Sequence, residues 1–362
     1  MKILITTPEL SKLSGVSKYF STMQNYSSDD IYFFIVGSRD HKEHWIKTVI
    51  RSVRDSIAFH YCLRKDDYNI VHLNPTFAWK SIPRDGFFLL IAKQAGTKTT
   101  VFFHGWDKNY ERQLTGWKLR AFKHIYFKAD AMIVLANEFK EKLRFWGYNG
   151  PIYTETTMID DNQIKDLQTV KGSKNNSKNI NLLFLARVEK AKGIYETIKA
   201  YCLLKNKYSD INLTVAGDGP ELTAVQEYVN HSKLENVYFL GYVRGNNKTA
   251  AFQNADIYVL PTQTEGMPIS VLEAMAFGLP VITRPVGGLK DFFENGKMGF
   301  ITESNDPNIY RRLIEKLITD FRLREKIGKY NQEYAIKYFA ASEVAHRLGN
   351  IYREVINSKS ST

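Results

Sequence analysis

Two glutamates stand eight positions apart in a stretch that is otherwise almost entirely apolar, Glu265 and Glu273 in EGMPISVLEAMAFGLPVI. Carboxylates are rarely buried without a partner. An ionised carboxylate accepts hydrogen bonds through two oxygens, so either side chain suits a sugar or ribose hydroxyl or a nearby cation. The stretch therefore predicts a polar site in apolar surroundings.

The residues between the two glutamates predict the start of a helix. We expect it to run from Pro268 to Phe277 and to end at Gly278, because proline suits the first helical position and glycine follows helix ends. The free N–H groups of its first turn would then offer a site for an anion or a hydroxyl. Glu265 would stand just before that turn, and Glu273 more than one turn inside the helix.

An alternative for the same stretch is a capping box. Ser270 and Glu273 have the S-x-x-E spacing in which serine caps a helix and glutamate reaches back to it. That arrangement leaves Pro268 outside the helix and the helix short. We therefore favour the start at Pro268, which gives Glu273 no capping role.

Basic and imidazole side chains also follow apolar runs. Arg187 and Lys192 flank a short loop that ends in glycine, and such a cation pair suits a diphosphate, although a solvated charged loop fits equally. His104 closes the run KTTVFFHG, where it would exchange a hydrogen bond with a bound hydroxyl or serve as a buried structural histidine. Gly15 precedes a helical segment, as an anion-binding turn or an ordinary one does.

The loop AGDGPEL resembles part of a dinucleotide fingerprint. It lacks the third glycine of G-x-G-x-x-G, and no acid stands at the end of the following apolar run. The sequence therefore argues against NAD binding.

The elements that position these residues are short apolar runs separated by helical segments, which predicts two doubly wound parallel sheets. In such sheets ligands bind beyond the carboxyl ends of the strands, and all the candidates above follow strands. A polar segment at 160–179 is the expected linker. The predicted strands lie within 2–7, 31–38, 69–75, 98–105, 130–137, 152–159, 181–188, 211–219, 237–244, 255–262, 279–286 and 298–304.

Length, charge and cysteine content narrow the class of protein. The 362 residues suit two domains, and the net charge of +12 suits phosphorylated small molecules or acidic lipid surfaces. No nucleic-acid-binding signature is present, so nucleic acid ranks last. The sequence has no apolar run long enough to span a membrane, and its two cysteines lack metal-like spacing. We therefore expect a cytoplasmic protein, either soluble or peripheral on the inner face of the plasma membrane.

Several of these motifs, in this order, resemble those of retaining glycosyltransferase family four, the group 1 glycosyltransferases. The resemblance is carried by Glu265-x7-Glu273, by TRPVGG at 283–288, by RVEKAKG at 187–193 and by GDGP at 217–220. It covers most of the second half, whereas the first half matches loosely at 14–18, 71–74 and His104. Serine at position 14 and Ala186 stand where the family often has glycine.

The resemblance implies a fold and a set of domains. The fold is α/β and of the GT-B type, with two Rossmann-like domains facing across a cleft. Residues 1–165 would bind the acceptor and residues 166–337 the nucleotide sugar. The C-terminal helix, about 338–362, would pack back on the first domain.

The resemblance also implies roles for the candidates. Glu273 would bind the ribose, Arg187 and Lys192 would neutralise the diphosphate, and Glu265 would hold hydroxyls of the donor sugar. His104 would contact the donor sugar near the reacting centre. The backbone and flanking contacts to the donor would come from Gly15, Val243, Gly266, Met267, Pro268 and Ile269.

The mechanism expected from the family is transfer with retained anomeric configuration. No D-x-D pair and no His/Cys/Asp cluster is present, so we expect no metal and no cofactor, with Arg187 and Lys192 stabilising the leaving group. Same-face transfer, in which the leaving phosphate accepts the acceptor's proton, is favoured. Double displacement through Glu265 is the alternative.

The expected function is transfer of a hexose from a UDP- or GDP-sugar to a glycan or lipid-linked acceptor, in bacterial cell-surface polysaccharide synthesis. Segments 44–65 and 116–132 mix aromatic and basic residues, as helices on an anionic membrane surface do. For segment 116–132, packing of the helix on the first sheet is a better explanation than membrane binding. For segment 44–65 the two explanations are equally good. The alternatives are a nucleotide-sugar epimerase of the same fold and a catalytically silent nucleotide-sugar-binding subunit.

Overall fold

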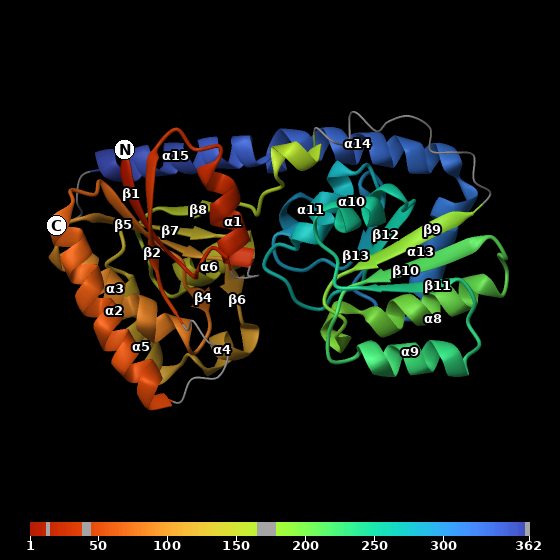
Figure 1. Cartoon of the computed structure of the whole chain (residues 1–362), viewed down its shortest axis with the longest axis horizontal. Coiled ribbons are helices and arrows are strands. Elements are labelled where there is room, and N and C mark those ends of the chain that lie inside the picture. Colours follow the sequence, from red (N-terminus) through yellow and green to blue (C-terminus); the bar gives the residue numbers. More distant parts are fainter. Residues whose placement is uncertain (12–14, 38–44, 165–178, 359–362) are drawn as a thin grey trace. The chain divides into compact units, whose positions relative to one another are not determined.

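The structure, a computed structural model, describes residues 1–11, 15–37, 45–164 and 179–358 (Figure 1). The chain divides into two compact units, one of Met1–Thr157 with Ala341–Thr362 and one of Met158–Ala340. The sequence placed these boundaries near 165 and 337. Most of the predicted linker at 160–179 lies outside the described residues.

The first unit contains a six-stranded parallel sheet in the order β2-β1-β3-β5-β7-β8. A short parallel pair, β4 with β6, lies beside it. The strands are β1 Lys2–Thr7, β2 Asp30–Ile35, β3 Ile70–Leu73, β4 Thr76–Phe77, β5 Lys98–Phe103, β6 Gly105–Trp106, β7 Ala131–Val134 and β8 Ile152–Thr154. The helices are α1 Gly15–Gln24, α2 Trp45–Lys65, α3 Ser81–Gln94, α4 Lys108–Gln113, α5 Gly116–Tyr126, α6 Asn137–Phe145 and α15 Ala341–Asn357.

The second unit repeats the design with a six-stranded parallel sheet in the order β11-β10-β9-β12-β13-β14. The strands are β9 Ile180–Leu185, β10 Ile211–Ala216, β11 Val237–Gly241, β12 Ile257–Leu260, β13 Val281–Thr283 and β14 Gly299–Ile301. The helices are η1 Lys190–Lys192, α8 Ile194–Lys205, α9 Leu222–His231, α10 Gly245–Gln253, α11 Ile269–Ala276, α12 Leu289–Phe292, α13 Pro307–Thr319 and α14 Phe321–Phe339.

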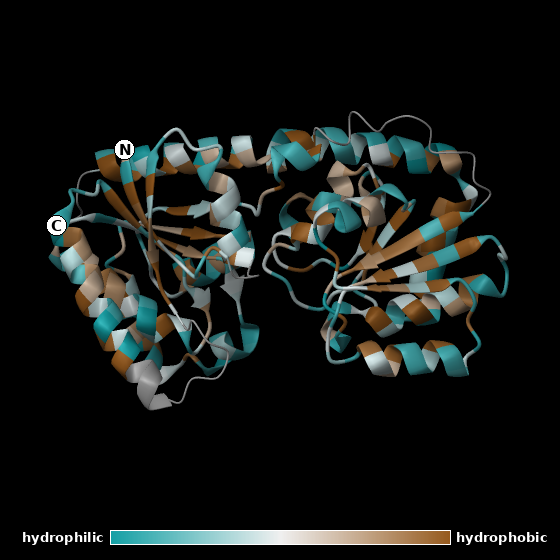
Figure 2. Cartoon of the chain, in the orientation of Figure 1, coloured by the Kyte–Doolittle hydropathy of each residue, from teal (hydrophilic) through white to brown (hydrophobic). Residues whose placement is uncertain are grey.

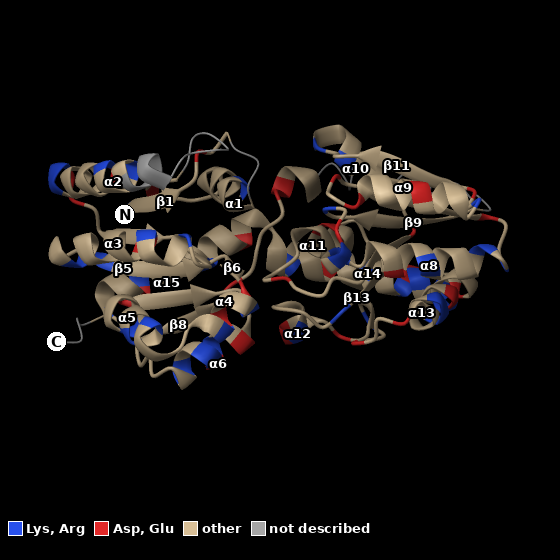
Figure 3. Ribbon diagram, turned by 90° about the horizontal axis from the view of Figure 1, so that it is seen from below, with Lys and Arg blue, Asp and Glu red and all other residues tan. Residues whose placement is uncertain are grey.

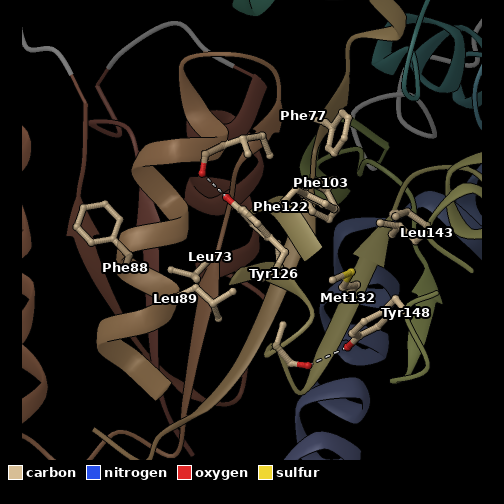
Figure 4. Close-up of a cluster of buried hydrophobic side chains, with 14 of the residues drawn as sticks. Leu73, Phe77, Phe88, Leu89, Phe103, Phe122, Tyr126, Met132, Leu143 and Tyr148 are labelled. Carbon is tan, nitrogen blue, oxygen red and sulfur yellow. Dashed lines mark hydrogen bonds between the residues drawn. The ribbon is translucent and has the colours of Figure 1, made fainter. Parts of the chain in front are cut away.

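The prediction of two doubly wound parallel sheets is confirmed, since each of the predicted runs contains a strand. Most strand residues are hydrophobic, as a sheet covered by helices on both faces requires (Figure 2). The core of the first unit packs aromatic rings of α3 and α5 on the sheet (Figure 4). Two of its buried hydroxyls have backbone acceptors: Tyr126 donates to the Ile82 carbonyl at 2.7 Å and Tyr148 to the Ala129 carbonyl at 2.9 Å.

Helix α15 belongs to the first unit and is held there by buried polar contacts. Arg347 donates to both carboxylate oxygens of Glu155, at 2.7 and 3.1 Å. The hydroxyl of Tyr352 lies 2.8 Å from Nδ1 of His72, and Nε2 of His72 lies 2.9 Å from Oδ1 of Asn74. These contacts join the C-terminal end of the chain to β3 and β8.

His72 makes the stability of the protein depend on pH. Burial lowers the pKa of His72 from 6.5 to about 4. On acidification the unfolded chain therefore binds a proton before the folded chain does, and folding stability falls as the pH drops through this window. We expect His72 to lower the free energy of unfolding by about 3 kcal/mol between pH 7 and pH 4. Burial also lowers the pKa of His104, which acts in the same direction.

Denaturant unfolding at several pH values tests this expectation. His72→Gln should flatten the fall in stability between pH 6.5 and pH 4. The matched control is His60→Gln, a half-buried residue of α2, which should leave the slope as it is in the wild type. Equal slopes for all three proteins would contradict the assignment to His72.

Candidate functional site

The stretch with the two glutamates is a loop followed by a short helix. Strand β12 ends at Leu260, and α11 begins at Ile269, with Pro268 in an extended conformation at the capping position. The carbonyl of Pro268 accepts from the N–H groups of Val271 and Leu272. The helix thus begins one residue later than predicted, because Pro268 closes the first turn through its carbonyl rather than lying inside it.

The capping-box alternative is wrong. Ser270 lies inside α11, and its hydroxyl accepts a hydrogen bond of 2.7 Å from Tyr258. Glu273 does not reach back to it but forms an ion pair with Lys248, at 2.5 Å. The side chain of Glu273 is 2% exposed, so this carboxylate lies deep in the unit beside a cation.

Lys248 was not among the predicted site residues. The sequence indicated that Glu273 needs a hydroxyl or a cation but gave no partner, because Lys248 lies on another helix 25 positions earlier. One feature of the sequence pointed to Lys248 as a possible partner: it is the only charged residue within α10.

Glu265 and Lys192, predicted for different parts of the donor, contact each other. Nζ of Lys192 lies 2.6 Å from Oε1 of Glu265, and both side chains are 18% exposed. Lys192 also donates to the Thr264 carbonyl at 3.5 Å, and the Thr262 hydroxyl donates to Glu265 at 3.3 Å. The Glu265 carboxylate therefore lies just before the N-terminus of α11, in contact with the Lys192 ammonium and the Thr262 hydroxyl.

Two glycines let the loops that carry these groups approach closely. Gly193 has a φ of +77°, and a Cβ there would lie 2.4 Å from the Pro261 carbonyl oxygen. Gly287 has a φ of +50°, and a Cβ there would lie 2.2 Å from the carbonyl oxygen of Gly266. The N–H of Gly288 donates to that same carbonyl at 2.8 Å. The loops after β9, β12 and β13 are thus packed backbone to backbone.

The remaining candidates of the second unit differ in burial: Met267 is buried, whereas Arg187 is exposed. The side chain of Arg187 is 67% exposed, and its Nε lies 3.7 Å from Glu189. Val243 is half-buried and follows β11. Gly266 and Met267 lie in the loop before α11.

The two candidates of the first unit lie on neighbouring elements. Gly15 is the exposed first residue of α1, and His104 follows β5. The ring of His104 packs on Phe102 and Tyr19, with centroids 3.8 and 4.7 Å apart. Its Nε2 is buried without a hydrogen-bond partner among the described residues. Burial, and secondly His72, hold the pKa of His104 well below its ordinary value, so the ring is neutral at pH 7.

The described part of the chain contains neither a cluster of metal-binding side chains nor a helix able to span a membrane. No His, Cys, Asp and Glu side chains gather there in a group that would hold a metal ion. None of the helices described has the length and apolar character that crossing a membrane requires.

Known proteins resemble this chain in sequence. Residues 166–334 match the family described as Glycosyl transferases group 1. The capsular polysaccharide biosynthesis glycosyltransferase CapM of Staphylococcus aureus is 30% identical over 220 residues, which is 60% of this chain and 56% of CapM. The N-acetyl-alpha-D-glucosaminyl L-malate synthase of Bacillus anthracis is 26% identical over 176 residues, 48% of this chain and 45% of that protein. The matches thus span about half the length of these relatives.

Solved structures resemble the whole chain in fold. The sucrose-phosphate synthase of Thermosynechococcus elongatus superposes with a TM-score of 0.77 at 18% identity, covering 99% of this chain and 100% of that one. Anabaena Alr3699/HepE in complex with UDP and glucose superposes with a TM-score of 0.74 at 16% identity, covering 98% and 99%. By these matches residues 166–334 are similar to the group 1 glycosyltransferases, and the chain has the GT-B fold.

Proposed function

We propose that the protein is a retaining glycosyltransferase that moves a hexose from a UDP- or GDP-sugar to a glycan or lipid-linked acceptor, in bacterial cell-surface polysaccharide synthesis. The observation that carries the proposal is the Lys192–Glu265 pair in front of α11, where a cation, a carboxylate and the first turn of a helix come together. The family match, the capsular relative and the UDP complexes of HepE support the reaction class and the donor class.

In this proposal each group acts on one part of the donor. Lys192 and Arg187 stabilise the charge that develops on the leaving diphosphate, with no metal or cofactor required. Glu265 and the backbone of Gly266, Met267, Pro268 and Ile269 hold sugar hydroxyls, and Glu273 holds the ribose. Val243 lies near the base.

The first unit supplies the remaining donor contacts in this proposal. His104 donates or accepts a hydrogen bond at the donor sugar, which its neutral ring and unpartnered Nε2 support. Gly15, at the start of α1, lies against the diphosphate.

Transfer takes place on one face of the sugar, and the leaving phosphate accepts the proton of the acceptor hydroxyl. The bond from the anomeric carbon to the phosphate oxygen breaks as the bond to the acceptor oxygen forms. Glu265 stabilises charge and is not the nucleophile. Mass spectrometry of the enzyme during turnover should therefore detect no glycosyl adduct on Glu265; such an adduct would establish double displacement instead.

A nucleotide panel tests the proposed function. UDP or GDP, or the corresponding sugar, at 100 times its dissociation constant should raise the free energy of unfolding by about 2.7 kcal/mol. Glu273→Ala should remove this stabilisation, because the ribose loses its acceptor. Unchanged unfolding with every nucleotide would refute the proposal.

Two alternatives share the nucleotide site. An epimerase would convert the nucleotide sugar without an acceptor, so product analysis in the absence of acceptor distinguishes it. A silent subunit would bind the nucleotide without turnover. The pairing of Lys192 with Glu265 favours an active enzyme over a silent subunit.

A peripheral position at the cytoplasmic face of the membrane is part of the proposal and is supported by α2. Its buried side packs on α3, with the rings of Phe59 and Phe88 4.9 Å apart. Its outward side, the α2 face, carries large exposed apolar residues at helical spacing: Ile50, Val53, Ile57 and Tyr61. Exposed Arg54, Arg64 and Lys65 accompany them, which suits an anionic lipid surface (Figure 3).

We expect the protein to sediment with anionic liposomes at low salt and to be released at high salt. The double variant Ile57→Asp with Tyr61→Asp should weaken this binding by about tenfold or more, because it places two acids on the α2 face. The control, Phe321→Asp on an exposed residue of the second unit, should bind as the wild type does. No binding of the wild type would remove the membrane from the proposal.

A further inference from the structure

Lys248 approaches the carboxylate to which the proposed function assigns the ribose. Its Nζ lies 2.5 Å from Oε2 of Glu273, with Glu273 2% exposed and Lys248 20% exposed. Helix α10 is fixed beside α11 by the stacked rings of Phe252 and Phe277, whose centroids are 4.9 Å apart. The ammonium is therefore built into the unit rather than lying loosely at its surface.

Several other polar groups around α11 have partners of their own. Strand β12 contributes Tyr258, whose hydroxyl donates to Ser270. Helix α14 contributes the neutral amide of Gln332, which donates to the Ala276 carbonyl. Strand β13, VIT, has no ionisable side chain. In the loops before α11 the charged groups are Glu265 and Lys192, which pair with each other.

The orientation of the Glu273 carboxylate decides whether it can hold a ribose diol. A carboxylate accepts hydrogen bonds through two oxygens and can receive both hydroxyls when it faces them. A buried carboxylate also needs a partner, and the ammonium of Lys248 lies against Oε2 of Glu273. The lysine thus fixes the carboxylate in one orientation and leaves acceptor capacity on it for the ribose.

We propose that Lys248 is a positioning residue for nucleotide recognition, which orients the Glu273 carboxylate to accept the ribose hydroxyls of the donor. The proposal rests on the proposed function, since Glu273 is its ribose ligand. Lys248 does not contact the reacting atoms and acts through Glu273.

Calorimetric titration of UDP and GDP at pH 7 tests the proposal. Binding of the recognised nucleotide should be about tenfold weaker in Lys248→Met than in the wild type, because the Glu273 carboxylate is no longer held in place for the ribose. Lys248→Arg keeps a cation at this place and should restore most of the affinity. Lys207→Met breaks the exposed pair with Glu315 in the same unit and should match the wild type.

A 2′-deoxy nucleotide provides the second measurement. The wild type should bind the 2′-deoxy analogue of the recognised nucleotide about tenfold more weakly than the ribonucleotide, and Lys248→Met should lose most of this difference. If Lys248→Met fails to fold, Lys248→Met with Glu273→Gln removes both charges of the pair and should lose the 2′-deoxy difference in the same way.

The outcomes distinguish the proposed function from the role of Lys248. Wild-type binding of neither UDP nor GDP would refute the proposed function and this inference with it. Wild-type affinity in Lys248→Met, or weaker binding with the 2′-deoxy difference intact, would overturn only the role of Lys248.

Discussion

Replacing Lys192 by alanine should lower kcat/KM for sugar transfer by about 10²–10³-fold, the cost of removing one preorganised group that stabilises developing charge. The ammonium of Lys192 lies 2.6 Å from Glu265 and is 18% exposed, so it is held in place and partly shielded from water. Such a cation acts more strongly on a leaving diphosphate than a mobile surface lysine does, because water screens it less and it need not reorganise. Loss of the ammonium also leaves Glu265 without its ion-pair partner.

The same turn of the chain supplies the control. Lys190 lies two residues before Lys192 in η1, its side chain is 75% exposed, and it lies 3.8 Å from Glu221. An exposed pair of this kind contributes little, so Lys190→Ala should change kcat/KM by no more than about twofold. Steady-state assays of both variants, with thermal unfolding to confirm that they fold, make the comparison. Equal losses in the two variants would mean that the loop acts only through its overall charge.

Sequence reasoning found the elements of this fold because each depends on local pattern. Apolar runs such as 2–7 and 257–260 form strands covered on both faces, and that burial is visible in the run itself. The start of α11 was correct to one residue, since a proline and a following glycine mark helix ends through backbone geometry alone. The choice between Pro268 and Ser270 was also local, and it was decided correctly.

The partners of the charged groups were beyond such reasoning, because they are set by tertiary packing. Lys192 and Glu265 were expected to act on separate parts of the donor, but the loops after β9 and β12 bring them into contact. Lys248 reaches Glu273 only because α10 packs beside α11. The spacing of residues along one helix or strand carries no information about a neighbour on another element. A carboxylate at a buried position shows that a partner is needed, but the sequence does not show which residue that partner is.

Replacing Gly287 by alanine should lower the free energy of unfolding by about 3 kcal/mol, the sum of a left-handed backbone and an overpacked contact. Its φ is +50°, and the added Cβ would lie 2.2 and 2.3 Å from the carbonyl oxygens of Gly266 and Glu265. Those oxygens belong to the backbone, so no side-chain rotation relieves the clash. The loop that carries Glu265 must then move away from the loop after β13.

This displacement of the loop should lower the catalytic activity as well as the stability of the protein. A shift of about 1 Å in a positioning group can cost about 10²-fold in rate, so we expect a loss of that order in kcat/KM for Gly287→Ala. Gly296→Ala is the matched control: its φ is +82°, yet no atom lies within 4 Å of the added Cβ. In that variant the free energy of unfolding should fall by about 1 kcal/mol, because of the left-handed backbone alone, and the activity should be retained. Denaturant unfolding and turnover of the two variants separate the cost of a left-handed alanine from the cost of the clash. If Gly287→Ala behaved like Gly296→Ala in both measurements, the close approach of the two loops would not be what holds Glu265 in place.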